Sequence, residues 1–296
     1  MPAAWPDYEL LDFGAGRRLE RFGELVVDRP CPAATASRQQ PALWASAAWR
    51  YEGERAAAGK WVGLRKNGVP LAEQLAAPIR CPLGVGASAA FEMSLSLSPA
   101  GQVGLFPEQF AHWQWLAAQT ARAENPLRLL NLFAYTGGST LAVVAAGAEA
   151  THVDAAKSAV AAARDNAARS GLAERPVRWI VEDAIAFCRR EVKRGRRYHG
   201  VILDPPSYGH GPHGEDWQIR RDLLELLELC GELTERRPRL VLLTCHTPGI
   251  DQAELAAHLS DGLFGACGQP PRTGEMTLQT AAGKKLPSGI YARWPG

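Results

Sequence analysis

The chain has 296 residues, of which 46% are hydrophobic and 22% are charged, and its formal net charge at pH 7 is +2. This is the composition of a globular protein with a full core, and the length predicts one large domain or two modest ones. No window reaches the roughly 18 apolar residues of a membrane span. The first residues lack the layout of a signal peptide, so we expect a cytoplasmic protein without a membrane partner.

The first hundred residues contain short strand-forming runs separated by turns. Residues 8–30 hold three such runs, interrupted at Gly14, Gly16 and Gly23, which is typical of an antiparallel meander. Residues 49–54 and 60–68 predict two more strands, and residues 91–106 predict a hairpin that turns at 99–101. We therefore predict a small β-rich domain over residues 1–103.

From residue 104 to residue 296 the pattern is that of an α/β domain. It begins with a helix predicted over residues 108–122. Strands are then predicted at 127–133, 150–154, 177–183, 198–204 and 238–245, and helices at 139–147, 156–171, 184–194, 217–235 and 252–263. This alternation predicts a parallel sheet covered on both faces. The last two strands, 274–281 and 286–294, have no helix between them and predict an antiparallel hairpin that completes a sheet of seven strands.

Chemically useful side chains follow the strands of this predicted sheet. Asp154, Asp183, Asp204 and Cys245 end four of the five alternating strands, and a loop with Gly137 ends the remaining one. Ligands of open parallel sheets bind outside the carboxyl ends of the strands. One such aspartate is as often a helix cap, but four in register predict a site.

The loop after the first of these strands indicates the class of ligand. It lacks the GxGxxG spacing that closes on a pyrophosphate. Asp154, 17 residues after Gly137, is placed to hold a ribose diol, to cap the next helix, or both. Asp183 is placed to accept a hydrogen bond from an adenine amine. A ligand with ribose and adenine but no pyrophosphate is an adenosyl compound, and S-adenosylmethionine (SAM) fits best.

The segments NLFAYTGG, HVDAAKSAV, VEDA and LDPPSYG are similar to motifs of the class I SAM-dependent methyltransferases. More narrowly, residues 104–294 resemble the family of bacterial large-subunit ribosomal RNA cytosine-5 methyltransferases. The resemblance implies a Rossmann-like sheet, SAM as cofactor and RNA, most specifically ribosomal RNA, as substrate. It implies cofactor contacts at Phe133, Tyr135, Thr136, Gly137, Asp154, Asp183, Asp204 and Gln109.

The chain departs from that family in two ways. Asn131 stands where many methyltransferases have an acidic residue. The longer RNA-binding members carry an extra N-terminal domain, for which we expect no room before the strand-rich segment, so the chain resembles the short form.

The LDPPSYG loop bears on the atom that is methylated. Ser207 separates the prolines from Tyr208, as in carbon-5 enzymes and some ring-nitrogen enzymes, rather than in exocyclic-amine enzymes. A pyrimidine carbon-5 must be activated by a thiolate that adds to carbon-6. Cys245, whose TCHT segment aligns with the family's cysteine motif, is the predicted nucleophile, with Asp204 on ring N3 and Tyr208 stacked on the base.

Other interpretations stay open at this point. Cys245 could be a buried structural thiol, in which case a base nitrogen would be the acceptor without a cysteine adduct. A nicotinamide-dependent oxidoreductase and a non-catalytic adenosyl-binding module are more remote alternatives. His246 follows Cys245 directly, but neighbouring side chains in an extended segment point to opposite faces. His210 and His213 have no third ligand nearby, so we expect no metal site.

Overall fold

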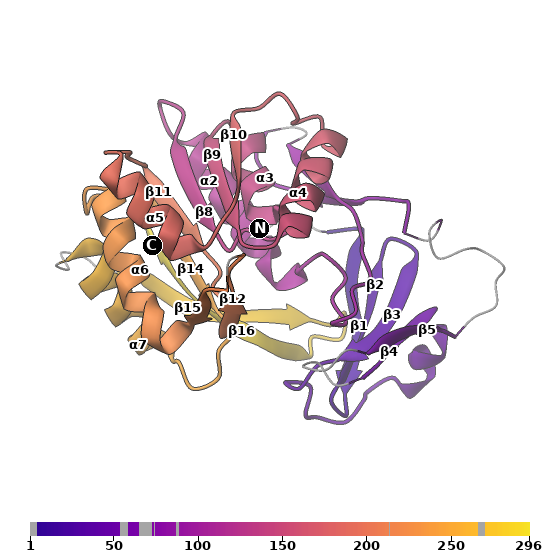
Figure 1. Cartoon of the computed structure of the whole chain (residues 1–296). Coiled ribbons are helices and arrows are strands. Elements are labelled where there is room, and N and C mark those ends of the chain that lie inside the picture. The colour runs from indigo at the N-terminus through magenta and orange to yellow at the C-terminus, as the bar shows by residue number, and fades with distance from the viewer. Residues whose placement is uncertain are drawn as a thin grey trace.

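The protein is described here by a computed structural model that covers residues 5–53, 59–64, 73, 75–86, 89–212, 214–265 and 270–296. These residues form two lobes, one built on a seven-stranded sheet and the other on a five-stranded sheet (Figure 1). No helix in these ranges is long and apolar enough to cross a membrane.

The five-stranded sheet forms the N-terminal lobe. Its strands follow chain order: β1 (Tyr8–Gly14), β2 (Arg17–Phe22), β3 (Leu25–Pro30), β4 (Trp49–Glu52) and β5 (Lys60–Gly63). The pairs β1–β2 and β2–β3 are antiparallel, which confirms the predicted meander. Between β3 and β4 lies a 3₁₀ helix, η1 (Pro41–Ser46), and β3 pairs with β4 in parallel.

The hairpin predicted over residues 91–106 is only partly correct. Its first strand is short, β7 (Ala90–Met93), and pairs with β6 (Ile79–Pro82) rather than with the residues after the turn. The turn does form, with Ser96 N donating to Val103 O at 3.0 Å, but without flanking strands. The strand ends early because Ser94 N donates to the Asn166 side chain at 2.9 Å instead of to a neighbouring strand.

The seven-stranded sheet has the order β10-β9-β8-β11-β14-β16-β15. The strands are β8 (Arg128–Leu132), β9 (Glu149–Asp154), β10 (Val177–Val181), β11 (Gly200–Leu203), β14 (Leu240–Cys245), β15 (Arg272–Gln279) and β16 (Lys285–Trp294). The first five strands are parallel to one another, and β16 pairs antiparallel with both β14 and β15. The strand order reverses between β8 and β11, so a ligand crevice is expected at their carboxyl ends.

Helices cover both faces of this sheet (Figure 1). They are α2 (Phe110–Ala121, after the 3₁₀ turn η2, Pro107–Gln109), α3 (Gly138–Ala145), α4 (Lys157–Arg169), α5 (Ala184–Lys193), α6 (Ile219–Leu233) and α7 (Gln252–His258, continued by the π-helical η3, Leu259–Phe264). Alternate strand residues enter different cores: Leu129 packs in one cluster with α2 and α3, and Leu130 in the other with α5 and α6. The period of two along each strand thus creates both cores.

The two lobes share a hydrophobic core. One cluster joins Phe22 and Val27 of the N-terminal sheet to Leu129 and Leu141 of the α/β lobe. The C-terminal hairpin also reaches back, because Lys284 Nζ donates to the Phe13 carbonyl oxygen at 2.8 Å. The division into domains at residues 103 and 104 stays a prediction, since apolar packing crosses it.

Candidate functional site

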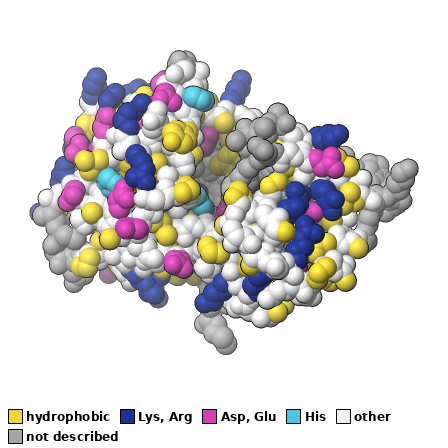
Figure 2. Space-filling view, turned by 90° about the horizontal axis from the view of Figure 1, so that it is seen from below, with side chains coloured by type: hydrophobic (Ala, Val, Ile, Leu, Met, Phe, Trp, Pro, Cys, Tyr) yellow, Lys and Arg dark blue, Asp and Glu magenta, His cyan; other side chains and the backbone are white. Residues whose placement is uncertain are grey.

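A cavity of about 720 Å³ lies at the carboxyl ends of β8, β9, β10, β11 and β14. It is closed on the other side by residues that precede α2, among them Phe106, and by Pro32 of the N-terminal lobe. The surface is hollowed between the two lobes (Figure 2). The volume is in the range of ligand sites and exceeds that of a single small metabolite.

The loop after β8 forms one wall of the cavity and is conformationally strained. Phe133 and Tyr135 both have positive φ, +55° and +46°, which non-glycine residues rarely adopt. Long-range contacts hold the loop in place. Thr136 Oγ1 donates to Gly104 O at 2.7 Å, and Asn166 Nδ2 donates to Thr136 O at 3.0 Å. Phe133, Tyr135 and Thr136 line the cavity, as three of the predicted cofactor contacts would require.

Glycine is required at positions 137 and 138 of this loop for different structural reasons. Gly137 is the N-cap residue directly before α3 and has φ +95°, and a Cβ there would lie 3.0 Å from that of Ala163. A Cβ on Gly138 would lie 2.5 Å from the Trp113 ring, so only glycine allows this packing. Gly138 lines the cavity whereas Gly137 does not, so the structure places the predicted contact Gly137 behind the wall.

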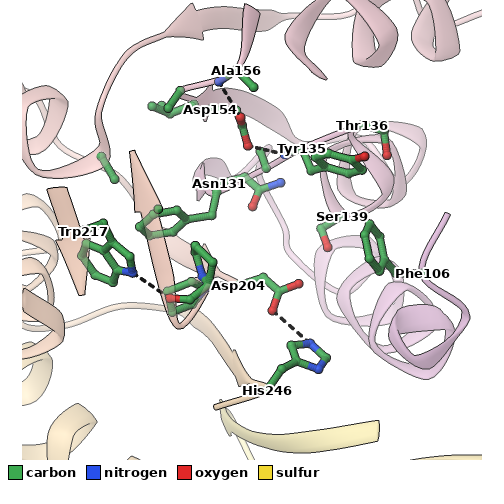
Figure 3. A pocket seen from close by; sticks show the side chains of 18 of the residues that line it. Phe106, Asn131, Tyr135, Thr136, Ser139, Asp154, Ala156, Asp204, Trp217 and His246 are labelled. Atoms are coloured by element: carbon green, nitrogen blue, oxygen red, sulfur yellow. Dashed lines mark hydrogen bonds and ion pairs between the residues drawn. The ribbon is translucent and has the colours of Figure 1, made fainter. Parts of the chain in front are cut away.

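Asp154 ends β9 and projects into the cavity (Figure 3). Its Oδ2 accepts from Tyr135 N at 2.8 Å and its Oδ1 from Ala156 N at 2.9 Å. Burial raises the pKa of this carboxyl, and the two amides partly offset that effect. Each oxygen keeps a further lone pair, so Asp154 can still accept two hydroxyl donors.

Asp183 has a structural role as well as a place in the cavity wall. It is the N-cap of α5, and its Oδ1 accepts from Ala186 N at 2.9 Å. It lines the same end of the cavity as Asp154. The cap uses one lone pair, so the carboxylate remains able to accept from a ligand.

Asp204 lies at the opposite end of the cavity, after β11, and is held by three side chains from two distant segments, η2 and the end of β14. Gln109 Nε2 donates to Asp204 Oδ2 at 3.0 Å and Thr244 Oγ1 donates to Oδ1 at 2.6 Å. His246 Nε2 lies 3.4 Å from Oδ1 (Figure 3). Gln109, predicted from the FPEQF segment, therefore both lines the cavity and positions Asp204.

The Asp204–His246 pair is ionised at neutral pH. Burial alone would raise the pKa of Asp204, but His246 and Thr244 outweigh it and the pKa is lowered. Burial alone would lower the pKa of His246, but the Asp204 carboxylate raises it to about 9. His112, buried nearby, has its pKa lowered to about 4 by burial and by Arg293, so it is neutral.

The two prolines after Asp204 are clamped by a residue that the sequence did not single out. Trp217 Nε1 donates to Pro206 O at 2.7 Å, and the indole packs 4.8 Å from the Phe133 ring. Trp217 lies on β13 (Asp216–Gln218), which pairs with β12 (Tyr208–His210). Tyr208, the predicted stacking residue, is 75% exposed and does not line the cavity.

Cys245 is not brought to the cavity. Its side chain is 1% exposed and belongs to the core cluster on the α5–α6 side of the sheet. Burial also raises the pKa of the Cys245 thiol. Thr244 and His246 flank it and both point to Asp204, as alternation along an extended segment requires. Cys245 was predicted to reach the cavity as a nucleophile, but the structure places its thiol in the core outside the cavity.

The site residues missed at the sequence level are His246, Trp217 and Glu108, all of which line the cavity. Of these three, only His246 could have been found from the sequence, because it directly follows the fifth predicted parallel strand. The histidine pair considered for metal binding is not tested as a pair, because His213 lies outside the described residues. His210 lines the cavity and lies 4.0 Å from Asp216.

Comparison with known proteins agrees with this geometry. The family described as S-adenosylmethionine-dependent methyltransferase matches residues 85–248, more than half of the chain. The chain belongs to this family. Among solved structures, the SAM-dependent methyltransferase from Agrobacterium tumefaciens is 32% identical with a TM-score of 0.86, and the match covers 97% of this chain and 90% of that one.

More distant relatives of this methyltransferase cover less or show the fold alone. Ribosomal RNA large subunit methyltransferase K/L of Shewanella baltica is 31% identical over 115 residues, 36% of this chain and 16% of that protein. The protein of the same name from Shewanella frigidimarina is 28% identical over 149 residues, 46% of this chain and 20% of that protein. SMU.776, complexed with SAH, shares the fold with a TM-score of 0.72 at 15% identity, covering 98% of this chain and 75% of that one.

The cofactor of this methyltransferase is SAM, and the cavity suits it. Carboxylates with free lone pairs stand at Asp154 and Asp183, as a ribose and an adenine amine require. Aromatic side chains stand between them and Asp204, with Phe106 and Tyr135 in edge-to-face contact at 5.4 Å. When bound, SAM supplies a methyl group activated by a sulfonium. The expected Rossmann-like fold, enzyme class and cofactor are thus confirmed.

Proposed function

We propose that this enzyme methylates a base in RNA, most specifically in ribosomal RNA. The observation that carries the proposal is that one cavity joins the cofactor end, at Asp154 and Asp183, to the rigid Asp204–Pro205–Pro206 corner. A flat base taken out of its helix would enter from the hollow between the lobes. The relatives named as ribosomal RNA methyltransferases support the choice of RNA, although the chain spans at most a fifth of their length.

The surface beside the cavity is compatible with RNA. Lys and Arg side chains gather on the N-terminal lobe to one side of the hollow (Figure 2). Phosphate contacts of such side chains position a nucleic acid without reading its sequence. The N-terminal lobe would then hold the strand, and Tyr208, exposed near the mouth, would stack on a base of it.

The proposed roles at the cofactor end follow from free lone pairs. Asp154 would hold the ribose hydroxyls, and Asp183 would accept from the adenine amine. Phe133, Tyr135 and Thr136 would line the adenosyl group, while Gly137 would contribute through the shape of the loop. Gln109 would face the methyl group from the other side.

The proposed chemistry at the acceptor end rests on Asp204. It is ionised, fixed by three donors and partly open, since 36% of its side chain remains exposed. It would accept a hydrogen bond from an N–H of the base and take the proton that the acceptor releases. His246 would keep Asp204 ionised, and Trp217 would keep the two prolines from moving.

The position of Cys245 favours a base nitrogen over a pyrimidine carbon-5 as the acceptor. A carbon-5 acceptor needs a thiolate within reach of carbon-6, but this thiol is buried in the core outside the cavity. A nitrogen acceptor carries its own lone pair and needs no adduct. We therefore infer methyl transfer without a cysteine adduct.

Two measurements test the proposal. Ribosomal RNA from cells with and without the gene, compared by mass spectrometry, should differ by one methylated nucleotide, which the purified enzyme restores. Calorimetry should show binding of SAM and SAH but not of NAD. The RNA proposal would be contradicted if ribosomal RNA were fully methylated in cells without the gene and the purified enzyme transferred no methyl group to any RNA. The assignment to the SAM-dependent methyltransferases would be unaffected.

A separate variant tests the acceptor atom. Cys245→Ser should keep turnover within about threefold, because the thiol lies outside the cavity. Neither the wild type nor Cys245→Ser should form a covalent complex with RNA that contains 5-fluorocytosine. A covalent complex in the wild type that disappears in Cys245→Ser would overturn the nitrogen proposal in favour of carbon-5.

A further inference from the structure

Glu108 is a charged group of the cavity wall that the proposed reaction does not use. It lies in the 3₁₀ turn η2, directly before Gln109, and lines the cavity. Its Oε2 is buried and has no hydrogen-bond partner among the described residues. A buried acceptor without a donor is unfavourable, so a donor from a ligand would be favoured there.

Glu108 lines the cavity near its acceptor end, because the next residue, Gln109, donates to Asp204 at 3.0 Å. It contributes to the raised pKa of His246 on one side and to that of Arg18 on the other. Arg18 is 8% exposed and lies 3.1 Å from Glu20, within the inner face of the N-terminal sheet. Glu108 thus has charged neighbours in both lobes, His246 in the α/β lobe and Arg18 in the N-terminal lobe.

The acceptor end offers more hydrogen-bond acceptors than donors. Two carboxylates, those of Glu108 and Asp204, line it, and among the described residues His246 is the cationic side chain beside them. The amide of Gln109 is already used, because its Nε2 donates to Asp204 and, at 3.2 Å, to Thr244. Such a wall matches a flat ligand edge that carries N–H donors.

We propose that Glu108 is a specificity-determining residue that accepts a hydrogen bond from the amino group of the acceptor base. The site would then take cytosine, adenine or guanine, which carry an amino group, in preference to uracil. A buried acceptor left unpaired by the wrong base penalises that base strongly. This inference rests on the proposed function for the choice of a nucleobase, but it does not depend on which nitrogen or carbon is methylated.

Matched nucleosides compare bases with and without the amino group. In both pairs the base without it also carries a hydrogen on the neighbouring ring nitrogen, so the effect of Glu108→Gln decides the assignment. With the enzyme saturated with SAH, cytidine and uridine are titrated by NMR, and adenosine and inosine in parallel. The cytidine dissociation constant should be at least about tenfold lower than that of uridine, with the same order for adenosine over inosine. Glu108→Gln should reduce this ratio to within about twofold. Glu124→Gln, an exposed glutamate outside the cavity, is the matched control and should keep the ratio.

The remaining outcomes overturn the proposal. Equal binding of cytidine and uridine by the wild type, binding of neither at their solubility limits, or an unchanged ratio in Glu108→Gln would each contradict it. A loss of SAM affinity in Glu108→Gln that exceeds the loss of cytidine affinity would make Glu108 a cofactor residue. RNA methylation is measured separately. If the enzyme prefers cytidine over uridine but methylates no RNA, the RNA proposal is refuted and the proposal for Glu108 is not.

Discussion

The two ends of the cavity hold their carboxylates in different ways. At the cofactor end, Asp154 accepts backbone N–H groups from positions 2 and 19 residues away, and Asp183 accepts from a position 3 residues away. At the acceptor end, Asp204 is held by side chains of Gln109 and Thr244, 95 and 40 residues away. The carboxylates of the cofactor end are therefore held by backbone N–H groups, and the carboxylate of the acceptor end by side chains that tertiary packing brings to it.

This difference has a chemical consequence. Backbone N–H groups do not titrate. At the cofactor end only the carboxylates themselves therefore change charge with pH, and their donors do not. The acceptor end contains a titratable pair, and its geometry depends on the charge of His246. Substitutions should therefore separate affinity for the cofactor from turnover.

The largest effect is expected from Asp204→Asn. The substitution removes the charge that holds the acceptor and the proposed proton acceptor, so turnover should fall about 10²–10⁴-fold. The pKa of His246 should also fall from about 9 towards its ordinary value, because the carboxylate that raises it is gone. Single-turnover methylation assays and NMR titration of the imidazole measure the two effects. Wild-type turnover, or an unshifted imidazole, would contradict the assignment of this end.

A smaller and different effect is expected from Asp154→Asn at the cofactor end. Loss of charge-assisted hydrogen bonds to the ribose should raise the SAM dissociation constant about 10–100-fold, equivalent to about 1.4–2.8 kcal/mol. Turnover at saturating SAM should change far less. Calorimetry with SAM and SAH checks this. Asp183→Ala serves as the comparison, since loss of the N-cap should also destabilise the start of α5 by about 1 kcal/mol. Unchanged SAM affinity in Asp154→Asn would rule out the ribose contact.

Gln109→Ala tests whether the acceptor end depends on packing of α2. The substitution removes one of the three donors to Asp204 and the donor to the Thr244 hydroxyl, so the free energy of unfolding should fall by about 1–3 kcal/mol. Turnover should fall while SAH binding remains. Chemical denaturation measures stability, and Gln119→Ala, within the following helix α2 and outside the cavity, is the control. An equal loss in both variants would assign the effect to helix propensity instead.

The smallest effect is the pH dependence of the Asp204–His246 pair. The folded pKa of His246 is raised to about 9, so its contribution to stability is complete below pH about 6.5 and is lost as the pH rises through 9. Asp204 has a lowered pKa, so its own contribution is lost on acidification below its ordinary range. The difference in melting temperature between wild type and His246→Gln should shrink between pH 7 and pH 10. A difference that is constant over this range would show that the pair contributes nothing.

Much of the fold could be predicted because it depends on local patterns. The alternation of strands and helices after residue 104 placed every strand of the seven-stranded sheet to within a few residues. The N-terminal meander was also correct. The hairpin after Phe91 was predicted less well, because Asn166 on the distant helix α4 takes the hydrogen bond that a strand neighbour would have made.

The sequence by itself determined the sheet, the cofactor class and the carboxylates at the strand ends, since each follows from a short-range period or from a position after a strand. It also determined that Cys245 and His246 point to opposite faces of β14. It did not determine which of the two meets the cavity. That choice was made when α2 packed on one face of the sheet, bringing Gln109 to Asp204 and Thr244, while α5 and α6 covered the other face and buried Cys245.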